Sequence, residues 1–121
     1  MDTNDQIQYV ELSAEEARKV INFAEAIERL DRNPDFRKVI HDGYFTDEAR
    51  RLTFLTADTA LDDKSANAVW AGIRAIAEFR AFLMARKSAG EVARKDLADQ
   101  LETLEELRNE QDGDGSLEVI A

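Results

Sequence analysis

The sequence predicts an all-α protein, and three observations support this fold class. Apolar residues recur at intervals of three and four along most of the chain, which is the spacing of one helix face. The chain of 121 residues contains 5 glycines and 1 proline, too few for a turn-rich β sandwich. Charged residues make up 35% of it. We expect one bundle-like domain of four to five helices, with an extended N-terminal segment and an acidic C-terminal helix followed by a tail.

The N-terminal segment, residues 1–12, is expected to be an extended arm. Its apolar Ile7 and Tyr9 alternate with glutamines, a pattern that allows a short strand or an ordered lead-in to a helix. The first helix is expected to begin at Ser13, which forms a capping box with Glu16.

The pair Asn33-Pro34 is expected to separate the first helix from a short second one. Asn33 is a good N-cap residue, and Pro34 suits the first helical position. Gly43 is expected to end the second helix, because glycine is favoured just beyond a helix C-terminus. Thr46 then caps a third helix, after a connection formed by residues 44–45.

The fourth helix, residues 64–87, is the most apolar segment of the chain. One apolar stripe runs through its centre, and a second, spaced by sevens, contains Trp70 and Met84. A helix that is apolar on two sides is usually buried between partners, some of which can be other chains. The sequence leaves open whether this helix breaks at residues 88–90. The residues expected in the core include Phe36, Trp70, Ile73, Ile76 and Phe79.

The domain organisation follows a change in charge along the chain. We expect a helical core domain over residues 13–90, an acidic amphipathic helix over 91–111, and a flexible linker with an apolar C-terminal tag over 112–121. Residues 91–121 carry ten acidic and three basic side chains, whereas residues 66–90 carry four basic side chains and one acidic. This contrast permits head-to-tail contact between copies, although both surfaces can equally be ordinary solvated faces.

The sequence predicts neither an enzyme nor a metal or cofactor site. The chain has no cysteine and a single histidine, His41, which is expected at a helix end, where the helix dipole favours an imidazolium. A catalytic triad would need a serine beside His41, but Ser13, Ser65 and Ser88 have the sequence context of helix starts. We therefore assign no catalytic, cofactor-binding or metal-binding residue.

The formal net charge of −10 argues against direct nucleic-acid binding, and no apolar run is long enough for a membrane span. Protein partners, other copies of the chain included, are the remaining expectation; a small-molecule substrate is not expected. The candidate partner-binding residues are Tyr44, Phe45, Trp70, Met84, Leu97, Leu101, Leu104, Leu117, Val119 and Ile120. The alternative is that they form internal core, and this alternative is strongest for Phe45 and Trp70 and weakest for the leucine ridge and the tag.

Two blocks of the sequence resemble a known group of proteins. The first runs from Glu28 to Leu52 and contains ERL, NPDFRKVI, GYF and EARRL; the second contains Ala75-Ile76 and residues 79–83, FRAFL. Together they are similar to a family of small helical proteins encoded in the structural gene modules of tailed bacteriophages. The resemblance covers about residues 28–83, roughly half of the chain.

The resemblance implies a context but no chemistry. It leads us to expect a non-enzymatic virion structural or assembly protein, made in the host cytoplasm and located in the virion. Such a protein would bind copies of itself and neighbouring portal, capsid or tail proteins. The alternatives are a free acidic inhibitor or nucleic-acid mimic, and a transient assembly scaffold.

Overall fold

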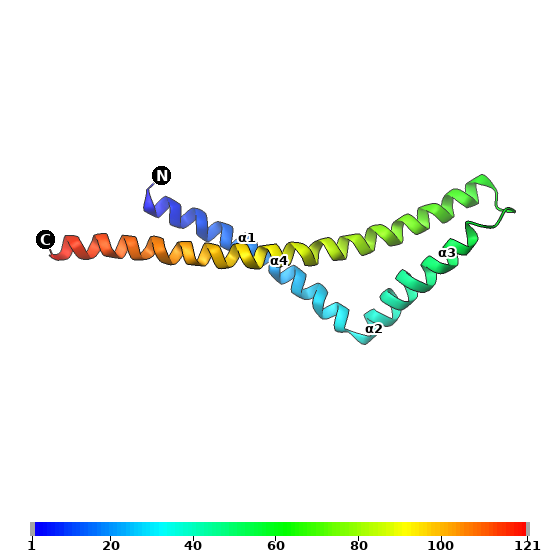
Figure 1. Ribbon diagram of the computed structural model, residues 1–121, viewed down its shortest axis with the longest axis horizontal. Coiled ribbons are helices and arrows are strands. Elements are labelled where there is room, and N and C mark those ends of the chain that lie inside the picture. The colour runs from blue at the N-terminus through cyan, green and yellow to red at the C-terminus, as the bar shows by residue number, and fades with distance from the viewer. Residues whose placement is uncertain (1, 121) are drawn as a thin grey trace. The chain divides into compact units, whose positions relative to one another are not determined.

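A computed structural model describes the backbone of residues 2–120 and the side chains of residues 2–113 (Figure 1). Every regular element in this range is a helix, which confirms the all-α prediction. The elements are α1 (Thr3–Arg32), α2 (Pro34–Phe36), the π-helix η1 (Arg37–Glu48), α3 (Ala49–Leu55) and α4 (Asp63–Ile120).

The chain divides into two compact units. Unit 1 comprises Met1–Ala24 and Ser88–Ala121, and unit 2 comprises Glu25–Lys87. Both unit boundaries fall inside helices, one in α1 and one in α4. Each unit has a hydrophobic cluster of its own.

Unit 1 is a pair of antiparallel helices. The first part of α1 runs alongside the C-terminal part of α4 (Figure 1), and Arg108 on α4 donates to Glu11 on α1 at 2.8 Å. Each helix faces its partner with residues spaced alternately by three and four, as in a coiled coil. These inward rows are Ile7, Val10, Ala14, Ala17, Ile21 and Ala24 on α1, and Gly90, Ala93, Leu97, Gln100, Leu104 and Leu107 on α4.

Small residues bring the two helices of unit 1 unusually close together. A Cβ atom added to Gly90 would lie 2.3 Å from the Cβ atom of Ala24, a distance that real Cβ atoms do not reach. Ala14, Ala17 and Ala93 are also buried in this unit. The interior of unit 1 therefore gains stability from close helix contact rather than from large side chains.

The predicted extended arm over residues 1–12 is wrong, because α1 begins at Thr3. Asp2 rather than Ser13 caps the helix: the Asp5 backbone N–H donates to Asp2 Oδ1 at 2.8 Å. The alternation of Ile7 and Tyr9 with glutamines is less informative than the helical spacing by three and four over a longer stretch. In that longer pattern, Ile7 begins the inward row of α1. Packing against α4 then supplies stability that an isolated segment would lack.

Unit 2 contains the helical run from α2 through η1 to α3, which packs against α4. Its buried cluster consists of Leu52, Val69 and Ile76, with partly buried apolar side chains around it. Asn33 and Pro34 begin the run as predicted: Asn33 Oδ1 accepts from the Phe36 backbone N–H at 3.0 Å, and Pro34 is the first helical residue. Asp62 caps α4 by accepting from the Ser65 backbone N–H at 2.7 Å.

The predicted break between a second and a third helix is wrong. Gly43 does not end a helix, and Thr46 does not begin one, because η1 passes through both without interruption. The Thr46 hydroxyl instead donates to the carbonyl of His41 at 2.9 Å, five residues back. The wide π turn places residues five apart above one another, and the Phe36 and His41 rings meet edge to face with centroids 5.5 Å apart.

The predicted core is correct at its centre and wrong at its edge. Ile76 is buried, and Ile73 and Phe79 are partly buried, as is Phe36. Trp70 is 58% exposed, because the inward face of α4 in unit 2 is formed by Val69, Ile76 and Leu83 and does not reach the neighbouring position. Helix α4 continues through residues 88–90, where the sequence left a break open, and through 112–113, where a linker was expected. No residue in these two stretches adopts a positive φ.

Candidate protein-binding surfaces

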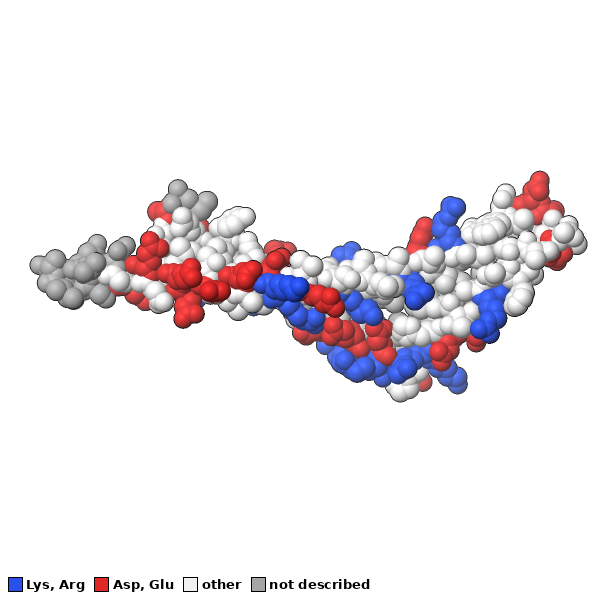
Figure 2. All heavy atoms as spheres, viewed as in Figure 1, with Lys and Arg blue, Asp and Glu red and all other residues white. Residues whose placement is uncertain are grey.

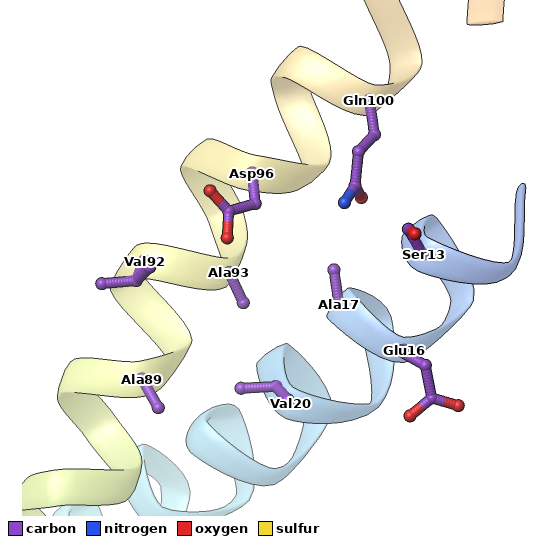
Figure 3. Close-up of a pocket in the computed structure, with 9 residues that line it drawn as sticks. All are labelled: Ser13, Glu16, Ala17, Val20, Ala89, Val92, Ala93, Asp96 and Gln100. Atoms are coloured by element: carbon purple, nitrogen blue, oxygen red, sulfur yellow. The ribbon is translucent and has the colours of Figure 1, made fainter. Parts of the chain in front are cut away.

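An apolar groove of about 440 Å³ lies between α1 and α4 in unit 1 (Figure 3). The methyl groups of Ala17 and Ala93, together with the Val20 side chain, point into the space between the helices. Val92 points away from this space and is exposed. The groove is concave because two buried alanines occupy positions where larger side chains would fill it. We call this surface the unit 1 groove.

The two carboxylates that line the unit 1 groove make its rim acidic. Glu16 lies on the α1 side and Asp96 on the α4 side, and both are exposed. Glu16 also pairs with Lys19 at 3.0 Å, and a hydrogen bond and the charge of this carboxylate raise the pKa of Lys19. A ligand for this groove would combine an apolar face with basic side chains.

Gln100 ends the groove with an acceptor that has no partner. Its side chain points toward the space between α1 and α4 (Figure 3), and its Oε1 atom is buried without a hydrogen bond. A buried acceptor that lacks a donor costs about 1–3 kcal/mol. A ligand that donates a hydrogen bond here would remove this cost.

The net charge of the molecule belongs to unit 1. The residues of unit 1 carry fifteen acidic and five basic side chains, and those of unit 2 carry eleven of each. Unit 1 therefore holds the entire formal net charge of −10. On the face that Figure 2 shows, acidic side chains gather over unit 1, whereas acidic and basic side chains alternate over unit 2.

An exposed row of residues on α4 forms a second candidate surface, in unit 2. Its members are spaced by four and three in alternation, and each is exposed: Trp70, Arg74, Ala77, Ala81 and Met84. We call this row the α4 seam. The spacing is that of a coiled-coil contact face, and the last member of the row, Met84, also lines a cavity beside Asp31. Between residues 66 and 87, α4 carries four basic side chains and one acidic.

Polar chemistry in unit 2 centres on Asp31. Lys87 Nζ donates to Asp31 Oδ2 at 2.9 Å, and His41 Nε2 lies 3.0 Å from Asp31 Oδ1. These three side chains and Arg80 line a cavity of about 220 Å³. The His41 ring is held edge to face between Phe36 and Phe45, with centroid distances of 5.5 and 5.6 Å.

The side chains that donate to Asp31 favour the ionised form of its carboxyl group. Burial raises the pKa of Asp31, but hydrogen bonds from Lys87 and His41 outweigh it, so this pKa lies below its ordinary value of 3.8. The arrangement connects the end of α1, η1 and α4 through one carboxylate. It is an ion pair in which each oxygen of Asp31 accepts one hydrogen bond.

The structure distributes the sequence-predicted partner residues over different surroundings. Tyr44 and Phe45 contact the Phe79 ring inside unit 2, with centroids 6.3 and 5.5 Å away. Trp70 and Met84 lie together on the exposed α4 seam. In unit 1, Leu104 is buried, Leu97 packs on the hydrophobic cluster, and Leu101 is exposed. The side chains of Leu117, Val119 and Ile120 lie outside the described residues.

Sequence reasoning missed the groove and the Asp31 cluster for different reasons. The groove was detectable in part, because Ala14 and Ala17 share the helical spacing of Ile7 and Ile21. The partners of Asp31 were not detectable from the sequence, because Lys87 is 56 residues away and no local pattern links the two residues. His41 was expected at a helix end and lies instead inside η1.

Comparisons with known proteins add no functional information. No family model, curated protein or solved structure matches the chain. Among the described residues, no group of three or more acidic or histidine side chains is placed to hold a metal ion. Within the same part of the chain, no helix is long and apolar enough to cross a membrane.

Proposed function

We propose that this chain is a non-enzymatic assembly protein of a tailed-bacteriophage virion, made in the host cytoplasm. It binds copies of itself and neighbouring portal, capsid or tail proteins through the exposed faces of its helices. The phage context is supported by the sequence blocks between Glu28 and Leu83. The assembly role is supported by the surface of the two units.

The single observation that carries the assembly role is the distribution of aromatic side chains. All nine of them lie in the described part of the chain, none is buried, and five are exposed. The interior is formed instead by eleven smaller apolar residues, four of which are alanines. Exposed apolar side chains mark contact surfaces for other proteins where they form a contiguous patch, and we propose that Trp70 belongs to such a patch on α4.

Helix association between copies would also complete the predicted bundle. Unit 1 alone is a two-helix layer, and such a layer leaves one side of each helix without a partner. A further helix in the unit 1 groove would form the third member of a bundle. The four-to-five-helix bundle expected from the sequence is thus proposed as a property of the assembly.

Two measurements test this function. Mass spectrometry of purified virions should detect the protein at a stoichiometric copy number, and light scattering of the isolated protein should show a mass that rises with concentration. A protein that is absent from virions, or that stays monomeric at every concentration, would contradict the proposal. Presence in immature particles alone would identify a transient scaffold.

One observation favours a second candidate function, that of a free acidic mimic of nucleic acid. The carboxylates of residues 91–113 lie on a helix, and exposed Asp99, Glu102 and Glu106 follow one another at intervals of three and four. A regular row of negative charges on a helix can bind to the DNA-binding surface of another protein in place of DNA. Absence from virions, together with displacement of DNA from a host protein, would select this candidate.

A further inference from the structure

We propose that the α4 seam of one copy docks in the unit 1 groove of the next copy, so that copies associate head to tail. This inference rests on the proposed function and names the partner of the groove: a second copy of the same chain. The two surfaces are complementary in shape, in charge and in hydrogen-bonding capacity.

Shape complementarity comes from opposite side-chain sizes. The floor of the groove is formed by Ala17 and Ala93, which leave room for large side chains. The seam presents one such side chain, Trp70 at 58% exposed, followed by Arg74 and two alanines. Knobs from one helix then fit a hole between two others, as in three-helix packing.

Charge complementarity decides between a head-to-tail contact and a symmetric one. A contact of two unit 1 grooves would bring the Glu16 and Asp96 carboxylates of one copy near those of the other. The seam instead carries Arg74 within a basic stretch of α4. Opposite charges therefore face each other only when the groove of one copy meets the seam of another.

The unpaired acceptor of Gln100 gives the contact a polar anchor. Arg74 carries five N–H donors on a long side chain, which can reach the Gln100 carboxamide once that side chain turns its buried Oε1 atom toward the groove. Its guanidinium can at the same time lie near the Asp96 carboxylate on the groove rim. An arginine is thus better suited to this position than an apolar residue.

The proposed contact joins two different surfaces, the seam of one copy and the groove of the next. A contact between two different surfaces generates a ring if its rotation closes and a filament if it does not.

A charge exchange across the contact provides the decisive experiment. Asp96→Lys and Arg74→Glu each place like charges opposite each other, so each variant alone should associate with a dissociation constant raised about tenfold or more. In an equimolar mixture, the altered groove of the Asp96→Lys variant can meet the altered seam of the Arg74→Glu variant. The unaltered groove and seam of the two variants can meet as well, so the two kinds of contact alternate along the assembly. Association should then return to the level of the unchanged protein, measured by analytical ultracentrifugation.

The single tryptophan reports on the same contact without a label. Trp70 is exposed, so its emission should shift to shorter wavelength when the unchanged protein associates, and in the mixture, but not in either variant alone. Circular dichroism should show the same helicity for all proteins, because both altered side chains are exposed. Increasing salt should weaken association of the unchanged protein.

Cysteine cross-linking keeps the inference falsifiable if either charge variant fails to fold. The chain has no cysteine, so Val20→Cys, at a side chain that points into the groove, marks the groove, and Ala81→Cys marks the seam. Cross-links should form between the two variants in a mixture and not within either variant alone.

The outcomes separate this inference from the proposed function. Cross-links of Val20→Cys to itself, or a mixture of charge variants that stays dissociated while the unchanged protein associates, would overturn the head-to-tail contact alone. An unchanged protein that remains monomeric would overturn the self-association as well. Virion mass spectrometry tests the phage assignment independently of both results.

Discussion

Unit 1 and unit 2 are stabilised in different ways, although both are built from the same two long helices. Unit 1 relies on closely packed small residues, with Gly90 directly against Ala24. Unit 2 relies on larger side chains, with aromatic rings around Phe79 and an ion pair at Asp31. Unit 1 also carries the whole formal net charge, whereas unit 2 is formally neutral.

This difference shows how close packing and surface binding depend on each other. Small residues let two helices approach, but the same residues leave a groove that nothing within the pair fills. In unit 2, the larger side chains fill the interior, and some of the exposed apolar residues, Trp70 among them, lie on α4. Unit 1 therefore presents the unit 1 groove, and unit 2 presents the α4 seam.

The largest effect is expected in the core of unit 2. Ile76 is 5% exposed and belongs to the cluster with Leu52 and Val69. Ile76→Ala should lower the free energy of unfolding by about 2–5 kcal/mol, because it leaves a cavity among large side chains. Chemical denaturation measures this loss. The matched control, Val39→Ala in η1, alters an exposed side chain and should leave the midpoint nearly unchanged.

Hydrogen exchange sharpens this comparison. If the two units are stabilised separately, Ile76→Ala should accelerate amide exchange mainly within residues 25–87. Uniform acceleration along the chain would show instead that the units unfold together.

The next effect concerns the close contact in unit 1. Gly90→Ala should cost about 1–3 kcal/mol, because the added methyl group overlaps Ala24 and forces the helices apart. The same substitution at Gly113, where nothing lies within 4 Å, should be neutral or stabilising, since alanine favours helix. Thermal denaturation of both variants measures the difference.

Gly72 provides the corresponding test in unit 2. An added Cβ atom there would lie 3.0 Å from Leu52 Cδ1, which is the far end of a flexible side chain and can move. Gly72→Ala should therefore cost less than Gly90→Ala. An equal or larger cost at Gly72 would contradict the contrast between a rigid small-residue contact and an adaptable core.

A smaller effect is expected at Asp31. Asp31→Asn removes the ion pair with Lys87 and should cost about 1 kcal/mol, the low end for charged hydrogen bonds, because Lys87 and His41 are each 37% exposed. The pKa of Asp31 is lowered in the folded state, so its stabilisation is present above the ordinary value and lost as the pH falls below about 4.

Urea denaturation at several pH values checks the Asp31 prediction. The unchanged protein should lose more stability between neutral pH and pH 3 than Asp31→Asn does. The control, Glu16→Gln, alters an ion pair whose side chains are 72% and 63% exposed and should leave the pH dependence unchanged. Parallel pH curves for the unchanged protein and Asp31→Asn would show that the carboxylate does not contribute.

The smallest effect on stability is expected at Trp70. Trp70→Ala should change the free energy of unfolding of the monomer by less than about 0.5 kcal/mol, because the side chain is 58% exposed. The same variant should weaken self-association. Denaturation at low concentration, combined with sedimentation at high concentration, separates the two effects. A large loss of monomer stability would place Trp70 in a core.

The sequence by itself determined the helical class and several helix boundaries. The spacing of apolar residues predicts helices because one face of each must leave water, and this requirement does not depend on the partner. Asn33-Pro34 predicts a helix start for a similarly local reason, since both residues act on their own backbone. The segregation of acidic side chains in residues 91–121 is also visible in the sequence.

Only the tertiary structure decided which apolar face is interior and which is surface. Residues 3–12 are helical because α4 pairs with them, although their local pattern also allows an extended arm. Gly43 lies within a π-helix rather than at a helix end, and Trp70 lies outside rather than inside. Asp31 meets Lys87 across 56 residues. Such contacts depend on the approach of segments that are distant in the sequence, and the local spacing of residues does not show which segments will meet.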